Sequence, residues 1–245
     1  MVRVKICGNT DADQVAWGVA AGADCLGFVV EYPVPVPWNL AREEARALFA
    51  RVPPMISRAL VCGGDPDQVI GLARELRPHL VQLHTDNTLA ETGAIARALA
   101  PLGIGLIRAL RIDVATGLAA GEITDPPAAA RALESTGVAA ILLDARTGEM
   151  PAGTGVSLDW GSAGRIRDEL SVPLILAGGL TPENVRAAIE QVRPYAVDVI
   201  SGVEVSRRVK SPELIRRFVH QARVAVGEVR LAAPGVPLAR QDQVV

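Results

Sequence analysis

The sequence has little cysteine, little surplus charge and no long hydrophobic run, and each shortage excludes a class of protein. Its three cysteines are too few and too irregularly spaced for a disulfide framework or a CxxC zinc site, which favours a reducing cytoplasm. The formal net charge of −2 over 245 residues provides no basic face for nucleic acid. No apolar run reaches the roughly 18 residues of a membrane-spanning helix, and the first residues lack the apolar segment of a secretory signal. We therefore expect a cytoplasmic protein without nucleic-acid or membrane partners.

The sequence is rich in short apolar runs that alternate with longer amphipathic segments. Most of the runs are continuously apolar, as expected for strands buried on both faces. Several amphipathic segments begin with a helix-capping signal such as Asp65-Pro66. This repetition predicts parallel βαβ units, and eight units favour a closed (β/α)8 barrel, an α/β fold, over an open sheet. The predicted strands are Val2–Ile6, Cys25–Val30, Ile56–Val61, Leu80–Leu83, Gly105–Ala109, Ala139–Leu143, Leu174–Ala177 and Ala196–Ile200.

The chain length suits a single domain, because a parallel barrel commonly has about 250 residues. We expect residues 1–227 to form the barrel and residues 228–245 to form a tail that is flexible or docks on a neighbour. The apolar helices and this tail permit a homodimer. Alternating prolines in the segment Glu31–Asn39 predict a stiff, extended loop after the second strand.

Two glycine-containing turns follow the last two predicted strands, where parallel barrels bind their ligands. Backbone N–H groups of such turns commonly converge on a phosphate. Each turn alone is equally consistent with a simple tight turn, but their occurrence on consecutive strands favours a phosphate site. A third glycine pair follows the sixth strand. The predicted phosphate-binding residues are Gly153, Gly155, Gly178, Gly179, Ser201 and Gly202.

Cys7 ends the first predicted strand and is followed by Gly8. Lys5 lies two residues earlier on the same side of the strand, and a nearby cation lowers a thiol pKa, which makes thiolate available as a base. The alternative is an inert buried thiol, the role that we assign to Cys25 and Cys62.

Asp144 follows a strongly apolar strand, where burial would raise its pKa and keep it protonated as a general acid requires. The alternative is a carboxylate that caps a loop or pairs with Arg146. His84 suits acid–base work or a packed, hydrogen-bonded position, and Gln82 and Arg108 also follow or end apolar runs. No His, Asp and Glu grouping has metal-ligand spacing, so no metal site is expected.

Taken in order, these motifs resemble the phosphoribosylanthranilate isomerase family of the tryptophan pathway over about residues 2–220. Any one of the motifs alone is weak, whereas the ordered set is specific. The motifs are Val4-Lys5-Ile6-Cys7-Gly8, Gly22-Ala23-Asp24-Cys25-Leu26-Gly27-Phe28, Val81-Gln82-Leu83-His84, Leu142-Leu143-Asp144, Gly153-Thr154-Gly155, Ala177-Gly178-Gly179-Leu180-Thr181-Pro182-Glu183-Asn184-Val185, and Asp198 to Glu204.

The resemblance implies an Amadori rearrangement, in which a phosphoribosylamine opens to an enol and becomes a 1-deoxyketose. It assigns Cys7 as the general base at ribose C2 and Asp144 as the general acid at the ring oxygen. It places the glycine turns on the phosphate and Asp198 near the amine of the substrate. It also implies a small phosphorylated substrate and no cofactor.

The loop after the second strand departs from the family pattern. The family has Ser-Pro-Arg-Tyr there, with the arginine on the anthranilate carboxylate, whereas this chain has Val36-Pro37-Trp38-Asn39. Tryptophan can stack on an aromatic ring but cannot clamp a carboxylate with two hydrogen bonds. Arg108 is one candidate for the missing clamp. Thr85 and Ala152 also replace family glycines.

Two alternatives follow from this departure. One is a paralogous barrel enzyme that acts on another phosphorylated compound, with Trp38 shaping the changed subsite. The other is a phosphate-metabolite binding protein without catalysis, which the presence of both Cys7 and Asp144 disfavours.

Overall fold

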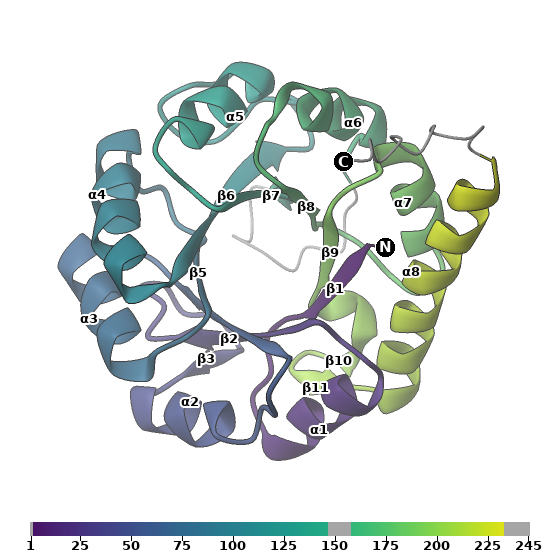
Figure 1. The fold of residues 1–245 in the computed structure, drawn as a ribbon, viewed down its shortest axis with the longest axis horizontal. Helices are drawn as coiled ribbons and strands as arrows, with labels where there is room; N and C mark the ends of the chain where they lie inside the picture. The colour runs from purple at the N-terminus through teal and green to yellow at the C-terminus, as the bar shows by residue number, and fades with distance from the viewer. Residues whose placement is uncertain (1, 147–157, 233–245) are drawn as a thin grey trace, which may run out of the picture.

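The computed structural model describes residues 2–146 and 158–232, the last seven of these by their backbone alone. In this part of the chain, eight parallel strands close into a barrel and the helices cover its outer face (Figure 1). The predicted (β/α)8 fold is confirmed. The barrel strands are β1 (Arg3–Ile6), β2 (Cys25–Val30), β4 (Ser57–Cys62), β5 (Leu80–Leu83), β6 (Gly105–Asp113), β7 (Ala140–Arg146), β8 (Leu174–Leu176) and β9 (Ala196–Val199).

The barrel closes because β1 pairs with strands from both ends of the chain. Lys5 of β1 is in register with Cys25 on β2 and with Asp198 on β9. A short strand, β3 (Asn39–Leu40), pairs with β2 outside the barrel. The proline-containing segment therefore returns to the sheet before α2 begins.

The helices begin where the sequence offers a polar cap. The side chains of Asp11, Asp65, Thr88, Asp125 and Asp159 each accept a backbone N–H of the first helical turn. The helices are α1 (Ala12–Ala20), α2 (Arg42–Phe49), α3 (Pro66–Leu76), α4 (Leu89–Leu99), α5 (Pro126–Glu134), α6 (Trp160–Glu169), α7 (Val185–Val192) and α8 (Pro212–Ala232), with 3-10 turns η1 (Ala100–Leu102) and η2 (Ser201–Val203).

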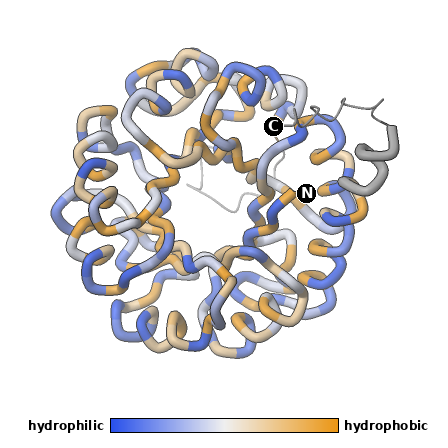
Figure 2. Tube along the Cα trace, viewed as in Figure 1, coloured by the Kyte–Doolittle hydropathy of each residue, from blue (hydrophilic) through white to orange (hydrophobic). Residues whose placement is uncertain are grey.

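The buried apolar side chains form two layers, one on each side of the strands. Along the chain trace, hydrophobic residues are frequent in the barrel strands, whereas the helices mix hydrophobic and hydrophilic residues (Figure 2). The larger layer lies between the strands and the helices and contains Phe28 and Phe218, both fully buried. The smaller layer fills the barrel interior with Ile107, Leu142 and Ile175. Strands buried on both faces explain why the predicted runs are continuously apolar.

Two strands extend further toward the ligand-binding end than the sequence predicts. β6 continues to Asp113 and β7 to Arg146, because the two strands stay paired up to the register partners Asp113 and Arg146. Polar residues in these extensions interrupt the apolar pattern, which is why the runs seemed to end at Ala109 and Leu143. A hairpin of β10 (Glu204–Ser206) and β11 (Val209–Lys210) was also not predicted.

The C-terminal helix α8 runs to Ala232, so it includes the first residues of the predicted tail, while residues 233–245 lie outside the described part. Arg223 on α8 donates to Val2 O and lies 2.7 Å from Asp24 Oδ2, which ties the helix to the amino-terminal end of the barrel. Within the described ranges, no helix combines the length and apolarity needed to cross a bilayer.

We predict that Phe218→Ala lowers the free energy of unfolding by about 3–5 kcal/mol, because it leaves a cavity between α8 and the barrel. Urea unfolding followed by circular dichroism measures the change. The fully exposed Met55 provides the control, since Met55→Ala removes no packed contact. A loss below about 1 kcal/mol for Phe218→Ala would show that α8 does not anchor the core.

Candidate active site

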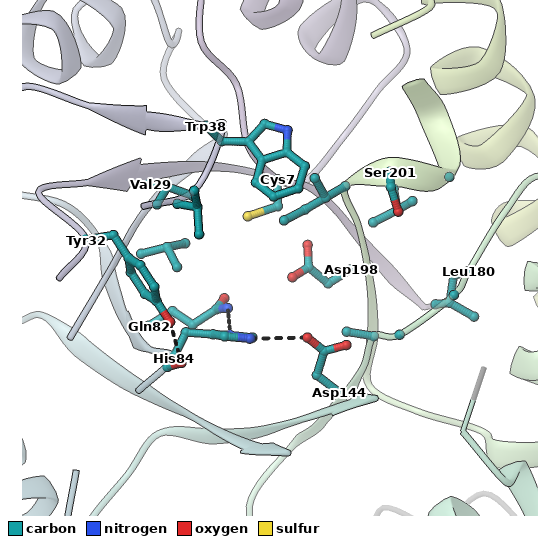
Figure 3. A pocket seen from close by; sticks show the side chains of 18 residues that line it. Cys7, Val29, Tyr32, Trp38, Gln82, His84, Asp144, Leu180, Asp198 and Ser201 are labelled. Carbon is teal, nitrogen blue, oxygen red and sulfur yellow. Dashed lines mark hydrogen bonds and ion pairs between the residues drawn. The ribbon is translucent and has the colours of Figure 1, made fainter. Parts of the chain in front are cut away.

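A cavity opens at the carboxyl ends of the barrel strands, the end at which parallel barrels bind ligands (Figure 3). It contains about 680 Å³ of open space, part of it continuous with solvent, which is within the size range of small-molecule sites. The predicted site residues that line it are Cys7, Trp38, Gln82, His84, Asp144, Gly178, Gly179, Asp198, Ser201 and Gly202.

Cys7 lies next to an ion pair that joins the two strands at the barrel closure. Lys5 and Cys7 share the interior face of β1, because side chains alternate along a strand. Lys5 Nζ lies 2.8 Å from Asp198 Oδ2 on β9, and both side chains are buried. Burial opposes the charge of Lys5, but Asp198 and the neighbouring thiols together outweigh it and raise the pKa of Lys5. Lys5 is therefore a permanent cation beneath the thiol.

Lys5 lowers the pKa of the Cys7 thiol, as expected, but not enough to bring it below its usual value. Burial raises the pKa of Cys7 more than Lys5 lowers it, and the negative charge of Asp198 adds to the increase. The physical reason is that Asp198 already neutralises Lys5. Gly27 on β2 leaves room for this arrangement, because a Cβ there would lie 2.6 Å from Cys7 Sγ and 3.0 Å from Lys5 Nζ. The free thiol is thus protonated at neutral pH.

Asp144 faces His84 across the barrel interior, and Gln82 orients the histidine ring (Figure 3). His84 Nε2 lies 3.2 Å from Asp144 Oδ2, at ion-pair distance but without the alignment of a hydrogen bond. Gln82 Nε2 lies 3.2 Å from His84 Nδ1. If the Gln82 amide nitrogen donates in this contact, Nδ1 accepts and the ring proton is on Nε2, toward Asp144. Between them lies β6, whose inward residue beside His84 is the small Ala109.

The glycine turns after β8 and β9 lie on one side of the cavity, near Leu180 and Ser201 (Figure 3). Gly178 has a φ of 81°, and a Cβ there would lie 2.7 Å from the backbone nitrogen of Ala145. A Cβ on Gly202 would lie 1.9 Å from the carbonyl oxygen of Leu180, so the two turns can approach each other only without side chains. Backbone groups and one hydroxyl are therefore exposed to the cavity here. The predicted third wall, Gly153 and Gly155, lies outside the described residues.

An apolar wall faces the glycine turns across the cavity. Val29 on β2, Val61 on β4 and Tyr32 of the following loop form it together with Cys7 and Trp38. The Tyr32 hydroxyl donates to the carbonyl oxygen of His84 at 2.7 Å, which joins the wall to the histidine. A flat aromatic group would fit against this surface.

Trp38 is fixed by a buried ion pair in the β10–β11 hairpin. Its Nε1 donates to Glu204 Oε1 at 2.7 Å, and Lys210 Nζ contacts the same oxygen at 3.1 Å. The indole ring packs over Gly8, whose Cβ equivalent would lie 3.0 Å from it. The ring therefore covers the Cys7 end of the cavity, while its only polar atom points away from the site.

The structure corrects the placement of Arg108. It lies within β6 rather than at its end, and it points toward the helices because Ile107 and Ala109 point inward. Its guanidinium donates to the backbone carbonyls of Ala109 and Asn87, at 2.6 and 3.0 Å. Arg108 is therefore not placed to contact a ligand in the cavity.

Three buried polar atoms of the cavity have no hydrogen-bond partner among the described residues. They are Gln82 Oε1, His84 Nε2 and Asp198 Oδ1. Buried polar groups are nearly always hydrogen-bonded in native proteins, so these atoms are candidates for ligand contact. Gln82 is on β5, His84 directly follows β5, and Asp198 is on β9.

Sequence reasoning missed the partners that hold the predicted residues in place. The pairing of Lys5 with Asp198 follows from side-chain alternation once β1 and β9 are known to be neighbours, which only barrel closure supplies. Glu204 was recognised in a motif but given no role, and nothing in the sequence marks Lys210 as its partner. Tyr32 lies two residues after the end of the second predicted strand, which is the one signal that could have identified it.

The sequence model of the family described as "PRAI: N-(5'phosphoribosyl)anthranilate (PRA) isomerase" matches residues 4–221. The chain belongs to this family. A curated relative from Haloferax volcanii, named N-(5'-phosphoribosyl)anthranilate isomerase, is 38% identical over 231 residues, which cover 94% of this chain and 96% of the relative. The solved phosphoribosyl anthranilate isomerase of Thermotoga maritima superposes with a TM-score of 0.76 at 34% identity, over 91% of this chain and all of that one.

A further solved phosphoribosyl anthranilate isomerase contains reduced 1-(o-carboxyphenylamino)-1-deoxyribulose 5-phosphate. It superposes with a TM-score of 0.72 at 33% identity, over 91% of this chain and 100% of that chain. In the chain described here, the residues that resemble the family's general acid, general base and phosphate-binding turns line one cavity. Trp38, which stands where the family has an arginine, is buried with its Nε1 bound to Glu204.

We predict that Lys5→Met lowers the free energy of unfolding by about 3–5 kcal/mol, because it leaves the buried Asp198 carboxylate without a counter-ion. Urea unfolding measures the change. The double variant Lys5→Met/Asp198→Asn should recover most of the loss, since it removes both charges. Equal stability of Lys5→Met and the wild type would mean that the ion pair is not structural.

Proposed function

We propose that this isomerase converts N-(5'-phosphoribosyl)anthranilate to 1-(o-carboxyphenylamino)-1-deoxyribulose 5-phosphate by an Amadori rearrangement, in tryptophan biosynthesis. The main support is one observation, that Cys7 and Asp144 line the same cavity as the paired glycine turns. The relative solved with the reduced product supports the same substrate class.

The substrate phosphate would bind at the glycine turns. Gly178, Gly179, Ser201 and Gly202 border one side of the cavity, and the glycines, which lack side chains, allow a close approach of backbone to ligand. Binding there would place the ribose over the centre of the cavity and the aminobenzoate ring against Val29, Tyr32 and Trp38 (Figure 3).

Asp144 would begin the reaction as general acid by giving a proton to the ribose ring oxygen. The bond between this oxygen and C1 breaks while the nitrogen lone pair forms a C1=N double bond, which gives an open-chain iminium ion. His84, 3.2 Å from Asp144, would keep the carboxyl group oriented and return a proton to it after turnover.

Cys7 would then act as general base and remove the proton from C2. The electrons of that C–H bond form a C1=C2 double bond and neutralise the iminium, which gives an enolamine. Transfer of a proton to C1, with loss of the proton of the C2 hydroxyl, converts it to the 2-ketose, so the reaction is an isomerisation without gain or loss of atoms. Asp198 Oδ1, a buried acceptor without a protein partner, would bind the amine N–H.

The two alternatives are less well supported. A paralogue with another phosphorylated substrate rests on the departure at Trp38, yet relatives that share at least a third of the sequence carry the isomerase name. A binding protein without catalysis would need neither Cys7 nor Asp144 in the cavity. We also infer a reducing compartment, because Cys7, Cys25 and Cys62 are all free. We further propose that the protein forms a homodimer.

We predict that the purified wild-type protein consumes phosphoribosylanthranilate, as followed by the fluorescence of the aminobenzoate ring. Cys7→Ser should lower kcat by about 10²- to 10⁴-fold, because a hydroxyl is a much poorer base than a thiolate. Affinity for the reduced product should change little. Cys62→Ala is the matched control, since that thiol is buried outside the cavity. Absence of turnover by folded wild-type protein would reject the proposed function.

We predict that kcat/KM rises with pH across the neutral and weakly alkaline range. The base acts only when deprotonated, and burial raises the pKa of Cys7 above its usual range, so the thiolate fraction grows about tenfold per pH unit below that pKa. Steady-state kinetics between pH 6.5 and about 9.5 measures the slope. A profile that is flat above neutral pH would contradict the protonated resting thiol.

A further inference from the structure

The proposed substrate carries a carboxylate on its aromatic ring, and the lysines of the cavity already have partners. Lys5 pairs with Asp198 at 2.8 Å, and Lys210 pairs with Glu204 at 3.1 Å, with all four side chains buried. Trp38 has no positive charge, and Arg108 points toward the helices. The carboxylate would therefore need a cation that sequence reasoning did not identify.

Arg111 occupies the inward-facing position of β6 at the rim of the barrel. Ile107 and Ala109 of the same strand belong to the interior layer, and Arg111 continues their alternation. It is the register partner of Asp144 on β7, which lines the cavity. Its side chain is only 7% exposed. Arg111 is thus beside the general acid Asp144, and it is one inward-facing position closer to the mouth of the barrel than Ala109.

The partner of Arg111 leaves part of the guanidinium available. It is Asp86, in the turn after β5, whose side chain is 59% exposed. Burial disfavours the charged carboxylate of Asp86, but the hydrogen bond and charge of Arg111 more than compensate and lower its pKa. An ion pair with so exposed a carboxylate contributes little, and a guanidinium has five N–H donors. A second carboxylate can share Arg111 with Asp86 or replace it.

The apolar wall lies within the electrostatic influence of Arg111. Burial raises the pKa of the Tyr32 hydroxyl to about 12, and Arg111 is the strongest influence that opposes this increase. Tyr32 and His84 lie on the opposite side of the cavity from Ser201 and Leu180 (Figure 3). A ligand with its phosphate at Ser201 would therefore extend its aromatic ring toward Tyr32, on the side of the cavity where Arg111 stands.

We propose that Arg111 is a specificity-determining residue that binds the ring carboxylate of the substrate. Trp38 stands at the position where the family resemblance expects an arginine for this role. This inference rests on the proposed function, because it takes an ortho-carboxylated aromatic amine as the aromatic end of the ligand. Charge recognition has moved from the loop after β2 to β6, and Trp38 provides a stacking surface instead.

The test compares two ligands by isothermal titration calorimetry. One is reduced 1-(o-carboxyphenylamino)-1-deoxyribulose 5-phosphate, and the other is the same compound without the carboxyl group. Arg111→Met should weaken the first about 10- to 100-fold, as expected for loss of hydrogen bonds to a charged group, and the second by less than about 2-fold. Arg111→Lys should give an intermediate loss for the first ligand, because it keeps the charge but not the planar pair of donors.

Asp86→Asn and Arg146→Met are the matched controls. Asp86→Asn removes the ion pair but keeps the guanidinium, so the carboxylated ligand should bind equally well or more tightly. Arg146 lies two residues beyond Asp144 on β7, so alternation places it on the same inward face. Arg146→Met therefore tests this second rim arginine against Arg111, and the inference expects the larger carboxylate-dependent loss in Arg111→Met. Thermal unfolding of each variant checks that it is folded, and Arg111→Lys supplies the same comparison if Arg111→Met is not.

Three results would overturn the inference. They are an equal loss for both ligands in Arg111→Met, the same loss in Asp86→Asn, which would indicate a purely structural ion pair, and a carboxylate-dependent loss only in Arg146→Met. Wild-type protein that binds neither ligand and turns over no phosphoribosylanthranilate would reject the proposed function, and this inference with it. Turnover by the wild type with no change in Arg111→Met would reject the inference alone.

Discussion

The ion pair between Lys5 and Asp198 is the interaction on which the site depends. It joins β1 to β9, so the same contact closes the barrel and forms the floor of the cavity. It also decides the state of Cys7, because a lysine neutralised by a carboxylate cannot offset the burial of a thiol. A base at this position therefore draws on a small thiolate fraction, which grows with pH.

The fold could be predicted almost completely from the sequence, because eight apolar runs separated by capped helices admit few other arrangements. The ends of the strands were less predictable. β6 and β7 continue through Arg111 and Asp144 because pairing between neighbouring strands holds polar residues in extended conformation, and no apolar pattern records such pairing. The error at Arg108 has this origin. Because the strand was predicted to end at Ala109, Arg108 was taken as a residue at its ligand-binding end, whereas the strand continues to Asp113.

The site was predictable where one residue type suffices for its role and unpredictable where two residues act together. Gly178 and Gly202 could be recognised in the sequence as turn glycines, and the structure shows that a side chain at either position would collide with backbone. The orientation of His84 by Gln82 and the anchoring of Trp38 by Glu204 are not, since both depend on contacts between different strands or loops. Family resemblance supplied roles for Cys7 and Asp144, but not the partners that tune them.

Trp38 and Arg111 are best understood together. An arginine on the loop after β2 would compete for Glu204, which the indole nitrogen and Lys210 now share. With tryptophan there, that end of the cavity becomes an apolar cover over Cys7 and excludes water from the thiol, which raises its pKa further. A cation for the carboxylate must then come from the opposite rim. Arg111 on β6 meets this requirement from beside the general acid Asp144, and no further charge is placed next to Cys7.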